Sequence, residues 1–339
     1  MVTPGVTETE TETAYSVLEL AVVGAGQSTA DALRATTEVA QAADRLGYRR
    51  LWVAEHHNMI AVASTTPPVL IAHLAAHTGR IRLGSGGVML PNHAPLVVAE
   101  QFAMLEALHP GRIDIGLGRA PGTDPVTASM LRRAGHSGAE PEFAREIQLI
   151  EALVAARADQ GASVAATPMP TSVPDIWVLG SSLSSAIVAS ALGLPYAFAH
   201  HFSGANTIAA TDLYRERFTP SPALAEPRVI VTCEAVAADT DTEAERLYLP
   251  AALSYLDLRR NVRAPMRTTE QAGEYAWTDA ERAFVRDRME GAAIGSTATT
   301  RTRLDDLAKR TGAGELMLLT RALRTEDRIE TLRRLARSS

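Results

Sequence analysis

A (β/α)8 barrel, also called a TIM barrel, is the fold that the amino-acid sequence predicts, and two observations predict it. Short β-branched or leucine-rich runs alternate with longer segments whose apolar residues recur at three-to-four spacing, as in repeated βα units. The runs number eight, and 339 residues with 46% hydrophobic composition can build one large barrel. An open, doubly wound sheet is the alternative, because strand number alone does not exclude it.

The expected strands are short apolar runs, such as the Leu-Trp-Val-Ala run that ends at position 54. Because the carboxyl ends of barrel strands meet at one mouth, the residues that follow each run should line that mouth. We expect strands at 17–23, 50–54, 81–85, 112–117, 176–179, 196–199, 228–236 and 315–319.

The expected helices are supported by signals at their ends. Pro67 and Pro95 stand in first turns, while Gly47, Gly79 and Gly193 follow the last periodic residues. We expect helices at 29–46, 67–78, 95–108, 142–156, 183–192, 205–218, 242–259, 299–311 and 325–336.

Three stretches do not belong to a minimal barrel. Residues 1–13 are rich in Thr and Glu and lack apolar anchors, which predicts a disordered tail before a single domain at 14–339. Residues 121–141 form an insertion after the fourth strand, and residues 261–295 form another after the seventh. We expect the 261–295 insertion to be a lid that is poorly ordered until ligands bind.

Composition excludes several functional classes. A net charge of −6 gives no general attraction for nucleic acid. The sequence has no apolar run of about 18 residues and no basic start of a secretory signal, so we expect a cytoplasmic protein without a membrane partner. Cys233 is the single cysteine, which rules out an internal disulfide.

Some motifs are too weak to carry a function. The segment Gly24-Ala-Gly-Gln-Ser-Thr imitates a dinucleotide fingerprint, but Thr29 occupies the third glycine position. His73 and His77 have a spacing that can hold zinc, yet the acid of a zinc hydrolase motif is missing, so no metal is expected. A nucleophile elbow is absent around Ser181 and Ser182.

Four stronger clusters follow consecutive strands and should meet at the mouth. They are Glu55-His56-His57-Asn58, Gly84-Ser-Gly-Gly, Arg119 and Gly180-Ser-Ser-Leu-Ser-Ser. Together they offer a base, a glycine-lined slot for a flat ring, a cation and a helix start that can hold an anion. A ligand with a flat ring and a phosphate, such as flavin mononucleotide (FMN), matches this set.

These segments resemble the bacterial luciferase-like flavin monooxygenases. The resemblance also covers Leu83-Gly-Ser-Gly-Gly-Val-Met-Leu-Pro-Asn-His, Pro110-Gly-Arg-Ile-Asp-Ile-Gly-Leu-Gly-Arg-Ala-Pro-Gly and Trp177-Val-Leu-Gly-Ser-Ser. It is closest to a single-chain subgroup that includes an antibiotic-pathway oxygenase. The resemblance implies an enzyme that takes reduced FMN from a separate flavin reductase, forms a flavin C4a-peroxide with O2 and oxygenates a small organic substrate.

The resemblance also assigns roles by position. His56 matches a catalytic base, and Glu55 matches an acid on the flavin side. The pair Gly86-Gly87 falls where luciferase has a cis peptide beneath the flavin ring, and His200 lies near a residue that packs on it. The implied phosphate site contains Arg119, Gly180, Ser181, Ser182 and Ser185. Gly118 replaces the reactive cysteine of luciferase, so light emission is not implied.

Two alternatives remain at this stage. One is an F420-dependent oxidoreductase on the same scaffold, and the other is a non-catalytic flavin-binding partner subunit. The resemblance further implies a homodimer formed through the helices at 67–78 and 95–108. The sequence does not identify the organic substrate.

Overall fold

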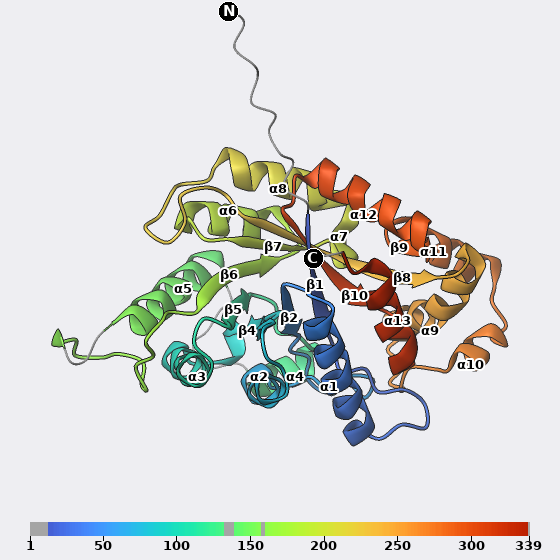
Figure 1. Ribbon diagram of the computed structural model, residues 1–339, viewed down its shortest axis with the longest axis horizontal. Helices are drawn as coiled ribbons and strands as arrows, with labels where there is room; N and C mark the ends of the chain where they lie inside the picture. Colours follow the sequence, from blue (N-terminus) through green and yellow to red (C-terminus); the bar gives the residue numbers. More distant parts are fainter. Residues whose placement is uncertain (1–12, 132–138, 157–159, 338–339) are drawn as a thin grey trace, which may run out of the picture.

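The computed structural model describes residues 13–131, 139–156 and 160–337 and contains a closed, 8-stranded parallel barrel (Figure 1). Its strands, in order around the barrel, are β1 (Ala14–Glu19), β2 (Arg50–Val53), β3 (Arg82–Ser85), β5 (Ile113–Gly118), β6 (Asp175–Gly180), β7 (Tyr196–Ala199), β8 (Val229–Ala238) and β10 (Glu315–Thr320). Strand β10 pairs with both β1 and β8. The barrel prediction is confirmed, and the open sheet is excluded because an open sheet would leave two edges unpaired.

The predicted helices surround the strands as a ring (Figure 1). They are α1 (Thr29–Arg45), α2 (Pro67–Ala76), α3 (Pro95–Leu108), α5 (Glu140–Ala155), α6 (Leu183–Leu192), α8 (Thr207–Glu216), α9 (Asp241–Arg259), α12 (Thr297–Thr311) and α13 (Thr325–Leu335). Gly193 ends α6 in the left-handed region, at a φ of 63° that favours glycine. Among the residues that the structure describes, no helix is both long and apolar enough to cross a membrane.

The barrel interior fixes which side chains can reach the mouth. Trp52 and Trp177 meet edge to face, with ring centroids 5.5 Å apart, inside a cluster that also contains Leu18, Ile230 and Met317. Because strand side chains alternate, every second residue of these strands faces the interior. Residues that continue this alternation past a strand end therefore project into the mouth.

The end of the barrel opposite the mouth is closed by ionic groups. Arg50 lies fully buried and donates to Asp114 and Glu315 at 2.7 Å each. Arg82 reaches Asp114 from the partly exposed side. These paired charges fill the floor, so a ligand has access from the mouth.

The two insertions contain elements that the sequence analysis did not predict. In residues 121–141 the structure forms α4 (Pro125–Leu131), and residues 132–138 lie outside its description. In residues 261–295 it forms α10 (Thr269–Gly273), α11 (Asp279–Glu290) and most of β9 (Ala293–Ser296), which pairs with β8. The short strand β4 (Val88–Met89) and helix α7 (His200–Ser203) were also missed. Of the predicted tail, residues 1–12 lie outside the described part of the chain.

Candidate active site

His56 projects into the barrel mouth from the end of β2. Trp52, Ala54 and His56 are alternate residues, so His56 continues the series whose side chains face the barrel interior. Its backbone N–H donates to the carbonyl oxygen of Ser64 at 3.0 Å. Its Nδ1 atom is buried and has no hydrogen-bond partner among the described residues. Burial lowers the pKa of His56 to about 4. The imidazole is therefore neutral at pH 7, and its buried Nδ1 is left unsatisfied by the described residues.

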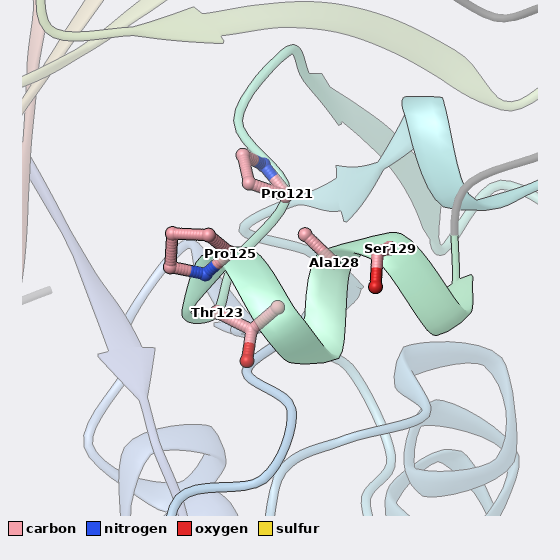
Figure 2. Close-up of a pocket in the computed structure, with 5 residues that line it drawn as sticks. All are labelled: Pro121, Thr123, Pro125, Ala128 and Ser129. Carbon is pink, nitrogen blue, oxygen red and sulfur yellow. The ribbon is translucent and has the colours of Figure 1, made fainter.

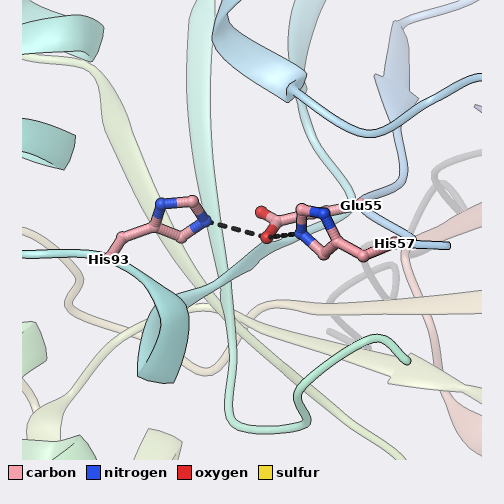
Figure 3. A group of neighbouring side chains, drawn as sticks. All are labelled: Glu55, His57 and His93. Carbon is pink, nitrogen blue, oxygen red and sulfur yellow. Dashed lines mark hydrogen bonds and ion pairs between the residues drawn. The ribbon is translucent and has the colours of Figure 1, made fainter. Parts of the chain in front are cut away.

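Glu55 faces sideways, toward the segment that follows β3 (Figure 3). Its carboxylate is fully buried and accepts hydrogen bonds from His57 Nε2 at 2.7 Å, His93 Nε2 at 2.8 Å and the backbone N–H of Met89 at 3.0 Å. Burial alone would raise the pKa of Glu55, but hydrogen bonds from His93, His57 and Met89 outweigh it and hold the pKa below its usual range. Glu55 is thus an ionised group that ties the segment after β2 to the segment after β3.

The Glu55, His57 and His93 cluster has the composition of a metal site, but its distances are those of hydrogen bonds. Both histidine Nε2 atoms lie 2.7 to 2.8 Å from the same carboxylate oxygen. Ligand atoms on a tetrahedral zinc ion lie roughly 3.3 Å apart, given bonds of about 2.0 Å. The cluster is therefore best described as a carboxylate with two imidazole donors.

The peptide bond between Gly86 and Gly87, after β3, is cis, as the family resemblance implied. Gly87 also requires glycine for steric reasons, whereas the close contact at Gly86 is with the movable end of a leucine side chain. A Cβ atom on Gly86 would lie 2.7 Å from Leu18 Cδ1, and one on Gly87 would lie 2.8 Å from the carbonyl oxygen of Gly116. Since β3 pairs with β2, this glycine pair lies beside the segment that carries His56.

The predicted anion site lies at the start of α6. Ser182 is the N-cap of this helix, but its side chain accepts no capping hydrogen bond. The Ser185 hydroxyl donates to the carbonyl oxygen of Ser182 at 2.7 Å and contacts the Tyr196 hydroxyl at 2.9 Å. A Cβ atom on Gly180 would lie 2.1 Å from Ser185 Oγ, so Gly180 permits this close packing. The backbone amides and Ser181, rather than the Ser185 hydroxyl, are the readier anion donors.

Arg119 follows β5, the strand that pairs with β6. Its side chain is half-buried and forms no hydrogen bond or ion pair with the described residues. Strand pairing therefore brings Arg119, a cation without a partner in the described ranges, to the side of the barrel that carries the α6 start. This is the arrangement expected of a phosphate site.

His200 follows β7, and its ring nitrogens are already occupied. One contacts the Thr207 hydroxyl at 2.7 Å and the other the carbonyl oxygen of Gly291 at 2.9 Å. Burial lowers the pKa of His200. The predicted cofactor contact can therefore use the ring face but not the ring nitrogens.

A cavity of about 280 Å³ lies beside the mouth, next to α4 (Figure 2). The segment around it is joined to the Glu55–Asn58 segment, since the His57 N–H donates to Gly122 at 3.1 Å and the Thr123 hydroxyl donates to the His57 carbonyl at 2.8 Å. The lining residues are Pro121, Thr123, Pro125, Ala128 and Ser129. Their largely apolar surface suits a hydrophobic part of a ligand.

A buried polar network on the other side of the mouth was missed by the sequence analysis. Glu234 of β8 accepts from the Tyr255 hydroxyl at 2.8 Å, the Tyr248 hydroxyl at 2.7 Å and Arg288 at 3.1 Å. Burial would raise the pKa of Glu234, but Arg321 and Arg288 hold it below its usual range. No short motif announces this network, because its members come from β8, α9, α11 and the end of β10.

The comparisons with known proteins place the chain in a family. A model described as luciferase-like monooxygenase matches residues 13–314, and the chain belongs to this family of oxidoreductases. An Escherichia coli luciferase-like monooxygenase is 40% identical over 91% of this chain and 92% of its own length. A Bacillus subtilis N-acetyl-S-alkylcysteine monooxygenase is 35% identical over 77% of this chain and 78% of its own length. The crystal structure of apo-MsnO8 has a TM-score of 0.88 and 37% identity, covering 96% of this chain and 98% of that one.

Two structures with lower sequence identity share only their fold with this chain. The oxygenating constituent of 3,6-diketocamphane monooxygenase from Pseudomonas putida, in complex with FMN, has a TM-score of 0.71 and 20% identity over 96% of this chain and 97% of that one. An F420-dependent secondary alcohol dehydrogenase has a TM-score of 0.68 and 14% identity over 96% of this chain and 98% of that one. The barrel fold is therefore known in one protein with FMN and in another that depends on F420.

Proposed function

We propose that this protein is an FMN-dependent monooxygenase that oxygenates a small organic substrate with O2. The observation that carries the proposal is the neutral imidazole of His56, whose buried Nδ1 has no partner in the part of the chain that the structure describes. A buried nitrogen of this kind is costly unless a ligand or a reacting group uses it. Its place at the mouth beside Gly86 and Gly87 is where a barrel enzyme performs chemistry.

The residues of the mouth fit FMN. Arg119, Ser181, Ser182 and the first amides of α6 would hold the phosphate, and Gly86-Gly87 would lie against the flat ring. When bound, reduced FMN would supply the electrons that activate O2, by the C4a-peroxyflavin chemistry that the family resemblance implies. A separate flavin reductase would deliver it.

Within this proposal, the two titratable residues after β2 have different tasks. His56 is neutral and accepts or returns a proton at its free nitrogen. Glu55 has its oxygens engaged by His57, His93 and Met89, so it positions the segment that carries His56. Both residues stay in place only if the β3 extension with His93 packs beside β2.

Titration of the purified protein with FMN and with F420 tests the cofactor. We expect FMN to bind more tightly, because the uncapped α6 start and Arg119 suit a terminal phosphate. Fluorescence quenching gives both dissociation constants in the same buffer. Tighter binding of F420 would contradict the proposal and favour an F420-dependent oxidoreductase. If FMN binds but reduced FMN drives no substrate-dependent oxygen uptake, the non-catalytic partner subunit is the better explanation.

The substrate in this proposal is a small organic molecule that accepts one oxygen atom. One relative is named for N-acetyl-S-alkylcysteines, so these compounds are the first to test.

We also propose that residues 261–295 cover the mouth. Arg263 reaches from this segment to the carbonyl oxygen of Asn58 at 2.8 Å, two residues after the candidate base in the sequence. The capping boxes of α10 and α11 give the segment more regular structure than the sequence analysis predicted. Its closing on ligand binding stays a prediction.

A homodimer is the proposed assembly, formed through α2 and α3. These helices carry apolar side chains that remain exposed: Val69, Leu96, Val97, Met104 and Leu108. We expect light scattering to give twice the chain mass at micromolar concentration, and Val97→Glu to produce monomers by placing a charge in this face. Val262→Glu, at an exposed valine outside both helices, is the control. A wild-type monomer would contradict the assembly without affecting the chemistry.

A further inference from the structure

Arg321 is a buried cation at the mouth whose hydrogen-bonding capacity is largely unused. It is 7% exposed, and its one ion pair joins Nε to Glu234 Oε1 at 3.2 Å, without the alignment of a hydrogen bond. Within the described residues the guanidinium donates no hydrogen bond. A guanidinium carries five N–H donors, so this one is poorly satisfied by the protein.

The neighbouring carboxylate does not compensate for this deficit. Both oxygens of Glu234 are already engaged, one by Tyr255 and the other by Tyr248 and Arg288. Arg288 and Arg321 thus share a single carboxylate, and Glu234 is the only acid among the main electrostatic neighbours of Arg321. The cluster keeps a net positive charge in a buried place, which a ligand anion would neutralise.

The position of Arg321 is inside the candidate active site. Met317 and Leu319 face the barrel interior, and Arg321 continues this alternation one step past β10. Its charge acts on His56, whose pKa it helps to lower. The Tyr255 ring lies against the guanidinium, with the ring centroid 5.1 Å from the Cζ atom, and holds it in place.

We propose that Arg321 determines substrate specificity by binding a carboxylate of the substrate beside His56. This inference rests on the proposed function and deepens it, since it gives the substrate class as organic acids. A guanidinium and a carboxylate are both planar and pair through two parallel hydrogen bonds. Glu234 and the Tyr255 ring hold the guanidinium in position, and Tyr248 and Arg288 orient Glu234. The substrate carboxylate then fixes the substrate relative to the base.

Matched acids and amides test the inference by calorimetry on the FMN-loaded protein. The probes are benzoate, octanoate and N-acetyl-S-benzylcysteine, each compared with its primary amide. We expect the wild type to bind at least one of the acids about tenfold more tightly, or better, than the amide of the same acid. Arg321→Met should remove that preference, and Arg321→Lys should keep part of it, because lysine keeps the charge but loses the planar fork. Arg324→Met, at an arginine that is 69% exposed, is the matched control and should behave as the wild type.

Several outcomes would overturn the inference. One is the absence of any acid preference in all three pairs, including the absence of measurable binding. Another is an acid preference that stays undiminished in Arg321→Met, or that stays undiminished in Arg321→Lys if Arg321→Met does not fold. A third is that Arg321→Met weakens FMN itself about tenfold without any probe, which would mean that the guanidinium binds the cofactor. If the wild type does not bind FMN, the proposed function fails, and the same titration on the apoprotein still decides whether the acids are preferred.

Discussion

Replacing His56 by alanine is expected to lower turnover about 10²-fold or more, while FMN binding and folding persist. The expectation follows from the neutral imidazole, whose buried Nδ1 lacks a partner among the residues that the structure describes. No ion pair or side-chain hydrogen bond involving His56 is formed within the described chain, so the substitution removes a reacting group and leaves the surrounding contacts in place. Oxygen uptake with reduced FMN and a substrate found by screening measures turnover, and circular dichroism confirms the fold.

The pH profile provides a second readout for His56. Because its pKa is about 4, the imidazole can accept a proton throughout the neutral range, and turnover should decline only as the pH falls toward 4. In the unfolded chain the group titrates near 6.5, so the unfolded state binds more protons between these values. Stability therefore decreases as the pH falls from about 6.5 toward 4, and this contribution should be absent in His56→Ala.

The variant His57→Ala tests which of the two neighbouring histidines is the base. His57 donates to Glu55, and its loss should disturb the mouth and reduce turnover less than the loss of His56. Undiminished turnover in His56→Ala, with a large loss in His57→Ala, would transfer the role of base to His57.

The barrel could be predicted from the sequence because each of its strands is a contiguous apolar run with a helix after it. The mouth residues His56, Gly86, Gly87 and Arg119 were predictable for the same reason, since each lies within three residues of the end of a strand. Strand β9 was missed because Ala-Ile-Gly-Ser is short and only weakly apolar. Strand β9 can pair because β8 is long, and the end of β8 continues beyond the residues that pair with β10.

Contacts between distant segments were the part that the sequence could not predict. His93 stands 38 residues from Glu55, and its place in a loop gives no sign that it donates to a buried carboxylate. Glu234 meets residues as far away as Arg288 and Arg321, and each of these alone resembles an ordinary helix or loop residue. Only the closed barrel brings such groups together, because the partners come from strands, helices and loops that lie far apart in the sequence.

Replacing Arg119 by alanine is expected to weaken FMN binding tenfold to a hundredfold. The guanidinium follows β5, next to the strand that leads into the uncapped α6 start, and no described residue pairs with it. A charge-assisted hydrogen bond to phosphate contributes about 1.5 to 3 kcal/mol, which corresponds to that loss of affinity. Because the phosphate receives this contact, riboflavin should bind wild type and variant almost equally. Fluorescence titrations with FMN and riboflavin measure both effects, and Arg217→Ala, at an exposed arginine after α8, is the matched control. An equal loss for riboflavin would show that Arg119 supports the ring or the fold instead of the phosphate.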